Sequence, residues 1–229
     1  MNIAFFDFDG TLTRHDSLFA FVAFVHGRGR LYRGLLSRCW ILAGYTLGLI
    51  SNTAAKQALM RYFFAGMGHA EFIGYCERFT SVLESMLRES ALDRLEWHKQ
   101  RGDKVVLVSA SFEEYLAPLC QKLGIACIGT QLEVVLPESN ELDSKSLDSS
   151  VRQSSTNAPN SGENAMSGGI LSGDFATPNC YGAQKVIRIR THYVLDTYTE
   201  IYVYGDSKGD REMLALATTP SHAFYKPFR

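Results

Sequence analysis

The sequence has little net charge, no C-x-x-C pair and no apolar run long enough to cross a bilayer. Its 229 residues carry a formal net charge of −1 and a pI near 6.6. This balance gives no electrostatic case for a nucleic-acid partner. The most apolar stretch, residues 39–50, has no charged residue, but a helix needs about 20 such residues to span a bilayer. The composition therefore indicates a soluble globular protein with a sizeable core.

The cysteines and the first residues bear on the compartment in which the protein is found. The cysteines are five, an odd number, and widely spaced: Cys39, Cys76, Cys120, Cys127 and Cys180. Residues 1–7 have no basic region of the kind that begins a secretory signal, and the apolar stretch there already ends in an acid. We therefore expect reduced thiols and a cytoplasmic location.

Residues 3–13 carry the strongest local pattern, four apolar residues that run into the sequence D-F-D-G-T. A short apolar run that ends in a turn signal predicts a buried strand, and parallel sheets bind ligands at the carboxyl end of such strands. In an extended chain Asp7 and Asp9 point to the same side. They repel one another, so one of them must bind a cation, take up a proton or turn away. Gly10 lets the backbone leave the strand with no side chain in the way.

The segment from residue 17 to about residue 98 is predicted to be helical, because apolar and aromatic residues recur at spacings of three and four. It is too long for one crossover helix. We interpret it as an inserted helical cap domain that returns to the core through a helix near residues 84–101. Residues 39–50 within it follow several arginines. They form either a buried cap helix or an interfacial element that contacts a membrane or a lipid-like substrate.

The chain after this segment alternates between buried strands and helices, which predicts right-handed parallel crossovers. The predicted strands are residues 103–108, 125–128, 200–204 and 222–225, and a helix over residues 113–123 joins the first two. We therefore predict an α/β fold, a Rossmann-like parallel sheet core with an inserted all-helical cap. Residues 1–16 and 99–229 would form the core and residues 17–98 the cap.

Residues 131–136 and 169–175 are predicted to be the two arms of a hairpin. The residues between them, 137–168, are rich in Ser, Asn, Gly and Glu and contain no aromatic residue. Such a composition buries too little apolar surface to offset the entropy lost on ordering. We expect a disordered insertion there with no catalytic role.

Reactive side chains follow the predicted strands in one consistent order: Asp7 and Asp9, then Ser109, then Lys185 just inside a helix, then Asp206 and Asp210. The corresponding motifs are D-F-D-G-T-L-T, V-L-V-S, the helical lysine and G-D-S-K-G-D. This set closely resembles the haloacid dehalogenase superfamily of phosphatases. The helical cap, the sequence N-C-Y-G-A-Q-K around the lysine and the final Y-K-P-F-R resemble its subfamily IB, the phosphoserine-phosphatase-like branch.

The resemblance implies a phosphatase that forms an aspartyl-phosphate. Asp7 would be the nucleophile, and Asp9 would protonate the leaving alkoxide and then deprotonate the attacking water. Mg²⁺ would bind the Asp7 carboxylate, the Asp9 backbone carbonyl and Asp206. Asp210 would complete or orient this set, with Gly10 and Thr11 in supporting positions.

The resemblance also implies how the phosphate is bound. Ser109 would donate its hydroxyl to a phosphate oxygen, with the N–H of Ala110 beside it. Lys185 would supply fixed positive charge where negative charge gathers.

The sequence indicates the substrate less directly than it indicates the reaction. Asp16 lies where the branch tends to carry a substrate-binding glutamate, and it either contacts the substrate or simply N-caps the first cap helix. Gly209 stands where relatives often carry an asparagine. No single arginine of the cap stands out as the partner of a phosphoserine carboxylate, and the candidates are Arg30, Arg33, Arg38 and Arg61.

The expected partner is a phosphate ester, either a small metabolite such as phosphoserine or the headgroup phosphate of a lipid. In the second case the cap would contact the inner face of a membrane peripherally. The alternative function is a phosphotransferase or phosphomutase that uses the same aspartate nucleophile. The sequence leaves the oligomeric state open.

Overall fold

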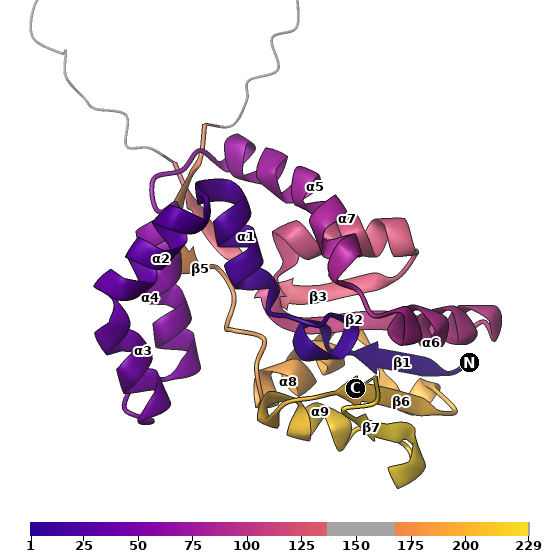
Figure 1. Cartoon of the computed structure of the whole chain (residues 1–229). Coiled ribbons are helices and arrows are strands. Elements are labelled where there is room, and N and C mark those ends of the chain that lie inside the picture. Colours follow the sequence, from indigo (N-terminus) through magenta and orange to yellow (C-terminus); the bar gives the residue numbers. More distant parts are fainter. Residues whose placement is uncertain (137–167, 229) are drawn as a thin grey trace, which may run out of the picture.

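The computed structural model describes residues 1–136 and 168–228, and these form the predicted α/β fold (Figure 1). Within the described residues, a five-stranded sheet has the order β3-β2-β1-β6-β7, and every neighbouring pair in it is parallel. Its strands are β1 (Ile3–Phe6), β2 (Lys104–Phe112), β3 (Ala126–Thr130), β6 (Ile201–Gly205) and β7 (Ala223–Tyr225). The parallel arrangement brings the carboxyl ends of β1, β2 and β6 to one edge of the sheet.

The central strand β1 is covered on both faces, which is why it reads as a continuous apolar run. Its side chains alternate between two apolar clusters. Ala4 and Phe6 belong to the cluster on one face, and Ile3 and Phe5 belong to the cluster on the other, all fully buried. The first face is covered by α6 (Glu89–Gln100) and α7 (Glu113–Leu123), and the second by α8 (Ala183–His192) and α9 (Arg211–Leu214).

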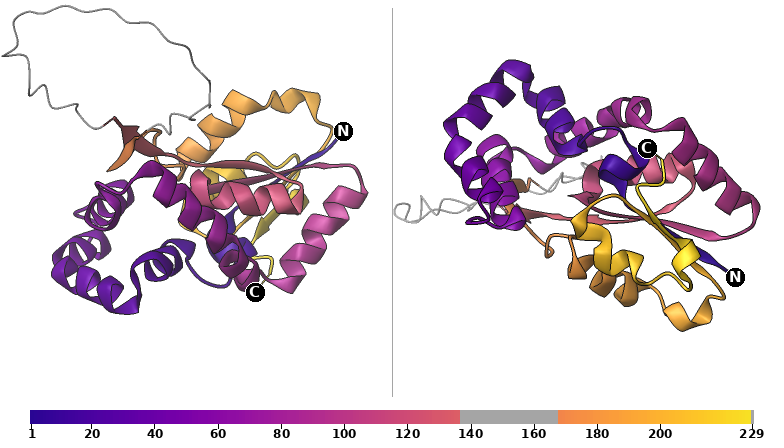
Figure 2. Two further views of the ribbon diagram at one scale, coloured as in Figure 1. Left: turned by 90° about the horizontal axis from the view of Figure 1, so that it is seen from above. Right: turned by 60° about the horizontal axis from the view of Figure 1, so that its bottom comes forward.

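The helices of the inserted segment stand mainly to one side of the sheet (Figures 1 and 2). They are α1 (Ser17–His26), α2 (Arg28–Ser37), α3 (Cys39–Thr46), α4 (Asn52–Phe64) and α5 (His69–Met86). Of these, α5 packs along α7 of the core. The predicted division between core and cap at residues 17 and 98 stays a prediction, since these contacts do not mark a boundary.

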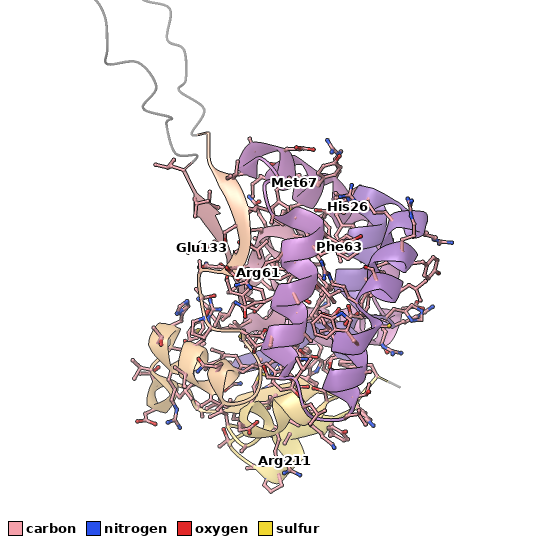
Figure 3. The ribbon with its side chains drawn as sticks, turned by 90° about the vertical axis from the view of Figure 1, so that its left-hand side faces the viewer. His26, Arg61, Phe63, Met67, Glu133 and Arg211 are labelled. Atoms are coloured by element: carbon pink, nitrogen blue, oxygen red, sulfur yellow. The ribbon has the colours of Figure 1, made fainter. Side chains whose placement is uncertain are left out.

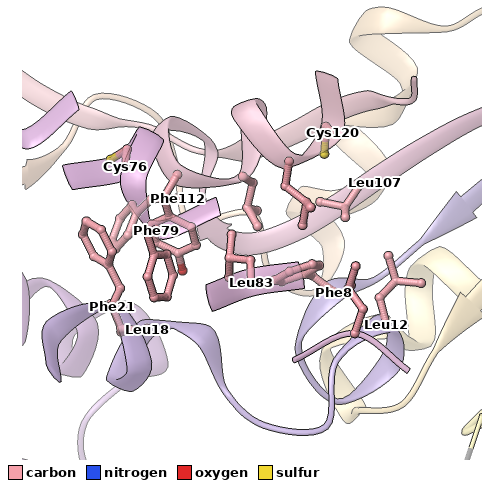
Figure 4. Packing of buried hydrophobic residues seen from close by; sticks show 14 of the residues in the cluster. Phe8, Leu12, Leu18, Phe21, Cys76, Phe79, Leu83, Leu107, Phe112 and Cys120 are labelled. Atoms are coloured by element: carbon pink, nitrogen blue, oxygen red, sulfur yellow. The ribbon is translucent and has the colours of Figure 1, made fainter. Parts of the chain in front are cut away.

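The apolar core is continuous between the helical segment and the sheet (Figure 4). Phe21 of α1 and Phe79 of α5 belong to the same cluster as Leu107 and Phe112 of β2. Phe21 contacts Phe79 edge-on, with ring centroids 5.0 Å apart. This shared core fixes α1 and α5 relative to the end of β2, where the site is built.

The helix predicted near residues 84–101 is present as α6, but it begins later than predicted, at Glu89. The chain is extended at Leu87 and Arg88, between α5 and α6. The reason is tertiary, because the N–H of Arg88 donates to the carbonyl of Leu12 at 2.9 Å and the N–H of Arg14 to that of Met86 at 3.2 Å. These bonds tie the end of α5 to the loop that follows β1.

The predicted hairpin is confirmed: β4 (Leu132–Val135) pairs antiparallel with β5 (Ile170–Phe175). The predicted disordered insertion, residues 137–168, lies outside the described residues except for its last one. The hairpin packs against α4, and Gly173 comes so close that an added Cβ would lie 2.6 Å from the Cα of Arg61. Figure 3 shows Arg61 on the side of α4 that faces the hairpin.

Two sequence features can be compared directly with the structure. All five cysteines are free thiols, and Cys39 is exposed. Across the described part of the chain, no helix combines the length and the apolar character that crossing a bilayer requires.

Candidate active site

Lys185 joins Asp7, the predicted nucleophile, to the loop that follows β6. Its Nζ donates to the Oδ1 of Asp7 and to the Oδ1 of Asp210, both at 2.6 Å, and to the carbonyl of Val108 at 2.9 Å. Asp7 follows β1, Val108 lies in β2 and Asp210 follows β6. The second carboxylate oxygen of Asp7 accepts from the hydroxyl of Thr11 at 3.1 Å. Three strand ends and α8 therefore meet at one ammonium group, as the sequence predicted.

The pKa values of Asp7, Lys185 and Asp210 depend on burial and on the charges of one another. Burial raises the pKa of Asp7 to about 7, against the opposing charge of Lys185. Burial opposes the charge of Lys185, but Asp7 and Asp210 outweigh it and hold the pKa of Lys185 above its usual value. For Asp210 the effect of burial is outweighed by Lys185, and the pKa of Asp210 is lowered. An added cation would further favour the ionised form of Asp7.

Asp7, Asp206 and Asp210 are buried and each offers an oxygen within 4.8 Å of the others. Gly10 leaves room for this cluster, since a Cβ added there would lie 2.5 Å from the Oδ2 of Asp206. Hard carboxylate oxygens in this number suit a divalent cation such as Mg²⁺. The residues present therefore fit the predicted metal.

Asp210 is held by the loop that follows β6. Its Oδ2 accepts from the N–H of Asp206 at 3.2 Å, the N–H of Ser207 at 2.9 Å and the hydroxyl of Ser207 at 2.7 Å. This capping arrangement, together with the bond from Lys185, uses both carboxylate oxygens. Asp210 thus fixes the shape of the loop that presents Asp206.

The side chain of Asp9 turns away from the acidic cluster toward α1. Its Oδ1 accepts from the N–H of Ser17 at 2.7 Å, and its Oδ2 accepts a short hydrogen bond from the hydroxyl of Ser111. Burial, with the charge of Asp16, raises the pKa of Asp9 to about 6, and the bonds from Ser111 and Ser17 oppose this. Its assignment as a metal ligand rests on the backbone carbonyl and stays a prediction.

Ser17, Ser111 and Tyr115 form a hydrogen-bonded set that sequence reasoning missed. The Ser17 hydroxyl lies 3.2 Å from that of Ser111 and 3.0 Å from that of Tyr115. Ser17 and Ser111 are 94 positions apart in sequence. No local pattern links serines at that separation, so only the shared contact with Asp9 identifies them.

Of the predicted phosphate-binding residues, Lys185 lies on α8, and Ser109 and Ala110 lie at the end of β2. This strand extends beyond the predicted limit of residue 108 to Phe112. The pairing of β2 with β3 shifts register between Val108 and Phe112. Within this irregular stretch the Ser109 hydroxyl accepts from the N–H of Ser111 at 3.0 Å. The accepting hydroxyl keeps its own proton free to donate to a phosphate.

These residues line a cavity of about 300 Å³ between the sheet edge and the helical segment. The core contributes Asp7, Asp9, Asp16, Ser109, Ala110, Ser111, Tyr181, Lys185, Ser207 and Asp210, and the helical segment contributes Leu18, Phe19, Asn52, Ala55, Lys56 and Leu59. The predicted catalytic and phosphate-binding residues are therefore in one cavity. Its volume suits a small molecule.

Lys56 is the cation that α4 places in this cavity. Its Nζ donates to the carbonyl of Ala110 and lies 4.4 Å from the ring centroid of Phe112. Burial lowers the pKa of Lys56 to about 8, although Asp9 and Asp16 oppose this. Sequence reasoning missed this lysine, because a lysine on a helix is most often a solvated one.

None of the four candidate arginines lines the cavity that the described residues form. Arg61 pairs with Asp174 of β5 at 2.6 Å, and Arg38 lies over the ring of Tyr62 at 4.5 Å. Arg30 and Arg33 are exposed on α2. Among the described residues, the cation that α4 contributes to the cavity is Lys56 and not Arg61.

Asp16 N-caps α1, which is one of the two alternatives that the sequence predicted. Its Oδ1 accepts from the N–H of Leu18 at 2.9 Å and from that of Phe19 at 3.3 Å. Asp16 also lines the cavity, and its contact with a substrate stays a prediction.

Comparisons with known proteins agree with this geometry. The family model described as haloacid dehalogenase-like hydrolase matches residues 4–150. The protein CicA of Caulobacter vibrioides is 30% identical, over 96% of this chain and 85% of its own. A histidinol-phosphatase of Neisseria meningitidis serogroup C is 23% identical, over 96% of this chain and 88% of its own. A phosphoserine phosphatase solved with a phospho-aspartyl intermediate analogue shares the fold, with a TM-score of 0.58 and 15% identity over 94% of this chain and 83% of that one.

Proposed function

The chain belongs to the haloacid dehalogenase-like hydrolase family, and from this premise we propose that it hydrolyses a phosphate monoester through a phosphoryl group carried on Asp7. The observation that carries the proposal is the meeting of Asp7, Asp9 and Lys185 with the end of β2 in one cavity. Such esters resist uncatalysed hydrolysis strongly, so a nucleophile that divides the reaction into two steps is effective.

In the first step a carboxylate oxygen of Asp7 attacks phosphorus, and the bond between phosphorus and the ester oxygen breaks. The departing alkoxide takes the proton of Asp9. The raised pKa of Asp9, about 6, leaves a fraction of that carboxyl protonated near neutral pH. The products of this step are the free alcohol and the Asp7 acyl phosphate.

In the second step Asp9, now ionised, takes a proton from a water molecule that attacks the same phosphorus. The bond between phosphorus and the Asp7 oxygen breaks, and inorganic phosphate leaves. Through both steps Lys185, the Ser109 hydroxyl and the N–H of Ala110 would hold the phosphoryl oxygens and offset their charge.

Asp7, Asp206 and the backbone carbonyl of Asp9 would hold a Mg²⁺ ion, with Asp210 orienting the loop. When bound, the ion neutralises charge between the Asp7 carboxylate and the incoming phosphate dianion. Asp7 must be ionised to attack, and its raised pKa of about 7 is one reason why a cation would be needed there.

The substrate we propose is a small phosphorylated metabolite, with phosphoserine and histidinol phosphate as the first compounds to test and a lipid headgroup phosphate as the third class. The relative that is a histidinol-phosphatase supports the second. A cytoplasmic location remains part of the proposal, and the five free thiols support a reducing compartment.

The test is phosphate release from p-nitrophenyl phosphate and from these candidates, with Mg²⁺ and then with EDTA. We expect turnover only with the metal, and none in Asp7→Asn. The control Asp196→Asn removes an exposed acid outside the cavity and should retain full activity. Full activity of Asp7→Asn would refute the mechanism.

A phosphotransferase or mutase would use the same nucleophile but exclude water. It is distinguished by adding an alcohol in excess and measuring its phosphorylation against the release of inorganic phosphate. Transfer to the alcohol that dominates over phosphate release would replace hydrolysis as the assigned reaction.

A further inference from the structure

Helices α2 and α3 and the connection from α3 to α4 expose an unusual amount of apolar surface. Tyr32 and Leu36 of α2, Trp40 of α3, and Leu47 and Leu49 in the connection to α4 are each between 63% and 79% exposed. We refer to α2, α3 and the connection as far as Leu49 as the cap tip. Figure 1 shows α2, α3 and α4 as a lobe that stands apart from the sheet. Exposed apolar side chains gathered in this way mark an interaction surface more often than single ones do.

The charge around the cap tip has one sign. Residues 17–70 contain no aspartate or glutamate. Of the six basic residues in this range, four belong to the cap tip, namely Arg28, Arg30, Arg33 and Arg38. The other two lie elsewhere, since Lys56 lines the cavity and Arg61 pairs with Asp174. The whole chain is nearly neutral, with a formal charge of −1. The positive charge is therefore a local feature of this segment, and it would attract an anionic surface.

The apolar and basic side chains of α2 share its outer face. Arg28, Tyr32 and Leu36 are spaced by four residues and so form one stripe along the helix, while Leu31 and Gly34 are buried on the other side. The eight residues of α3 span only about 12 Å at 1.5 Å per residue. This is the build of an element that lies in a membrane interface without crossing it.

We propose that the cap tip binds the surface of a bilayer that contains anionic lipid. The arginines would contact lipid phosphates, Tyr32 and Trp40 would lie at headgroup depth, and Leu36, Leu47 and Leu49 would enter the acyl boundary. A second copy of the chain fits less well, because two such surfaces would bring like charges together. A nucleic acid would use the arginines but leave the exposed leucines in water.

The first experiment is co-sedimentation of the full chain with vesicles of phosphatidylcholine alone and of phosphatidylcholine mixed with phosphatidylglycerol. We expect binding to the mixed vesicles, weakened by salt, and little binding to the neutral ones. The variant Leu47→Ser/Leu49→Ser should bind at least tenfold more weakly. Arg28→Gln/Arg30→Gln/Arg33→Gln should lose about a hundredfold, since each basic residue near an anionic surface contributes about fivefold.

Matched controls change the same residue types on the core. Ile187→Ser/Val194→Ser removes two exposed apolar side chains, and Arg190→Gln/Arg211→Gln removes two exposed arginines. Arg211 lies at the far side of the molecule from His26 and Met67 of the helical segment (Figure 3). Both control variants should bind like the unchanged chain, and equal losses in controls and cap-tip variants would overturn the proposal.

A second readout locates the contact. The chain has two tryptophans, so Trp97→Phe leaves Trp40 as the only tryptophan, which is excited selectively. Its emission should shift to the blue with mixed vesicles and be quenched by brominated lipid chains. The proposal would be overturned by a lack of binding to mixed vesicles at low salt, or by a Trp40 emission that does not change on binding. It would also be overturned if the chain bound no vesicle and instead formed a soluble dimer that Leu47→Ser/Leu49→Ser dissociates.

Discussion

The ring of Tyr181 lies against the backbone of Gly209, in the space that a side chain at position 209 would occupy. The residue after Tyr181 is also bonded to Gly209, since the N–H of Gly182 donates to the carbonyl of Gly209 at 3.0 Å. Tyr181 lines the cavity. The absence of a side chain at position 209 is thus matched by an aromatic ring that covers the same wall.

This pairing predicts that Gly209→Asn is destabilising. The new side chain must displace Tyr181, and overpacking of this kind costs about 1–3 kcal/mol in the free energy of unfolding. Because Tyr181 lines the cavity, kcat/KM should also fall. Urea denaturation and steady-state kinetics measure the two effects.

The matched control is Gly29→Asn on α2, where no atom lies within 4 Å of an added Cβ. Replacing Tyr181 by alanine in the Gly209→Asn background should restore most of the lost stability. If Gly209→Asn unfolds and reacts like the unchanged protein, the ring does not determine what position 209 can hold.

Lys56 predicts a pH dependence of substrate affinity. Its pKa is lowered to about 8, so the ammonium loses its charge as the pH rises through 8. An anionic substrate in the cavity should then bind less well, and KM should rise above pH 8 while kcat changes less. In Lys56→Gln this rise should be absent, with KM already higher at pH 7.

The size of that effect follows from the charge that is removed. A hydrogen bond to a charged group contributes about 1.5–3 kcal/mol, or roughly tenfold to hundredfold in KM. Lys56→Arg keeps the charge at all accessible pH values and should move the rise in KM beyond the measured range. A KM in Lys56→Gln equal to that of the unchanged protein, across pH 6–9, would exclude a substrate contact.

Asp9 as general acid predicts a dependence on the leaving group. Removing a positioned proton donor costs about 10²–10⁴ in rate. Asp9→Asn should therefore slow the first step, formation of the phosphoenzyme, far more with an alkyl phosphate than with p-nitrophenyl phosphate, whose leaving group departs without a proton. Because Asp9 also activates water, the variant should release one equivalent of p-nitrophenol rapidly and then stall as the phosphoenzyme.

Rapid-quench kinetics with labelled substrate would detect that burst, and peptide mapping would locate the phosphate on Asp7. Ser207→Ala is a useful comparison, since Ser207 holds Asp210 and does not contact Asp9 in the structure. Ser207→Ala should lower the rates of reaction of both substrates by the same factor. Equal slowing of the first step with the two substrates in Asp9→Asn would contradict the acid role.

The sequence predicted the sheet and the acids at its edge because these are local patterns. The buried strand that ends at Asp7 and the later strand that ends before Asp206 each combine an apolar run with a turn signal. The break between α5 and α6 was missed because no glycine or proline marks it. It is made by backbone hydrogen bonds from Arg88 to Leu12 and from Arg14 to Met86, which no local pattern contains.

The same distinction applies to the site. Lys185 was predicted from its place in a motif. Lys56 lies in a helix, and its neighbours in the sequence, Ala55 and Gln57, give no indication that it lines a cavity. Its position is set by α4 packing against the β4–β5 hairpin and reaching the carbonyl of Ala110. Such a residue is identified only once the helical segment and the core are placed together.

A buried histidine in the core predicts how stability depends on pH. The Nδ1 of His98 lies 2.8 Å from the Oδ2 of Asp103, and its Nε2 lies 2.9 Å from the hydroxyl of Tyr204. A neutral ring with its proton on Nδ1 donates to the carboxylate and accepts from the tyrosine. Burial lowers the pKa of His98 below its ordinary value of 6.5, although Asp103 opposes this.

The unfolded chain therefore takes up a proton on this histidine at a higher pH than the folded one does. The stability linked to His98 is present above pH 6.5 and is lost as the pH falls below 6.5 toward the lower folded pKa. Asp7 and Asp9 act in the opposite direction, since their pKa values are raised in the folded state. The contribution of His98 must thus be measured as a difference between variants.

We expect His98→Gln to lower the free energy of unfolding at pH 7.5 by about 1–3 kcal/mol, because buried partners lose their hydrogen bonds. The difference from the unchanged protein should shrink between pH 6.5 and pH 5, since the variant has no ring to protonate. His192→Gln, at the exposed end of α8, should show neither effect. Urea denaturation at a series of pH values measures the difference, and a gap that stays constant over that range would mean that His98 is not held neutral by burial.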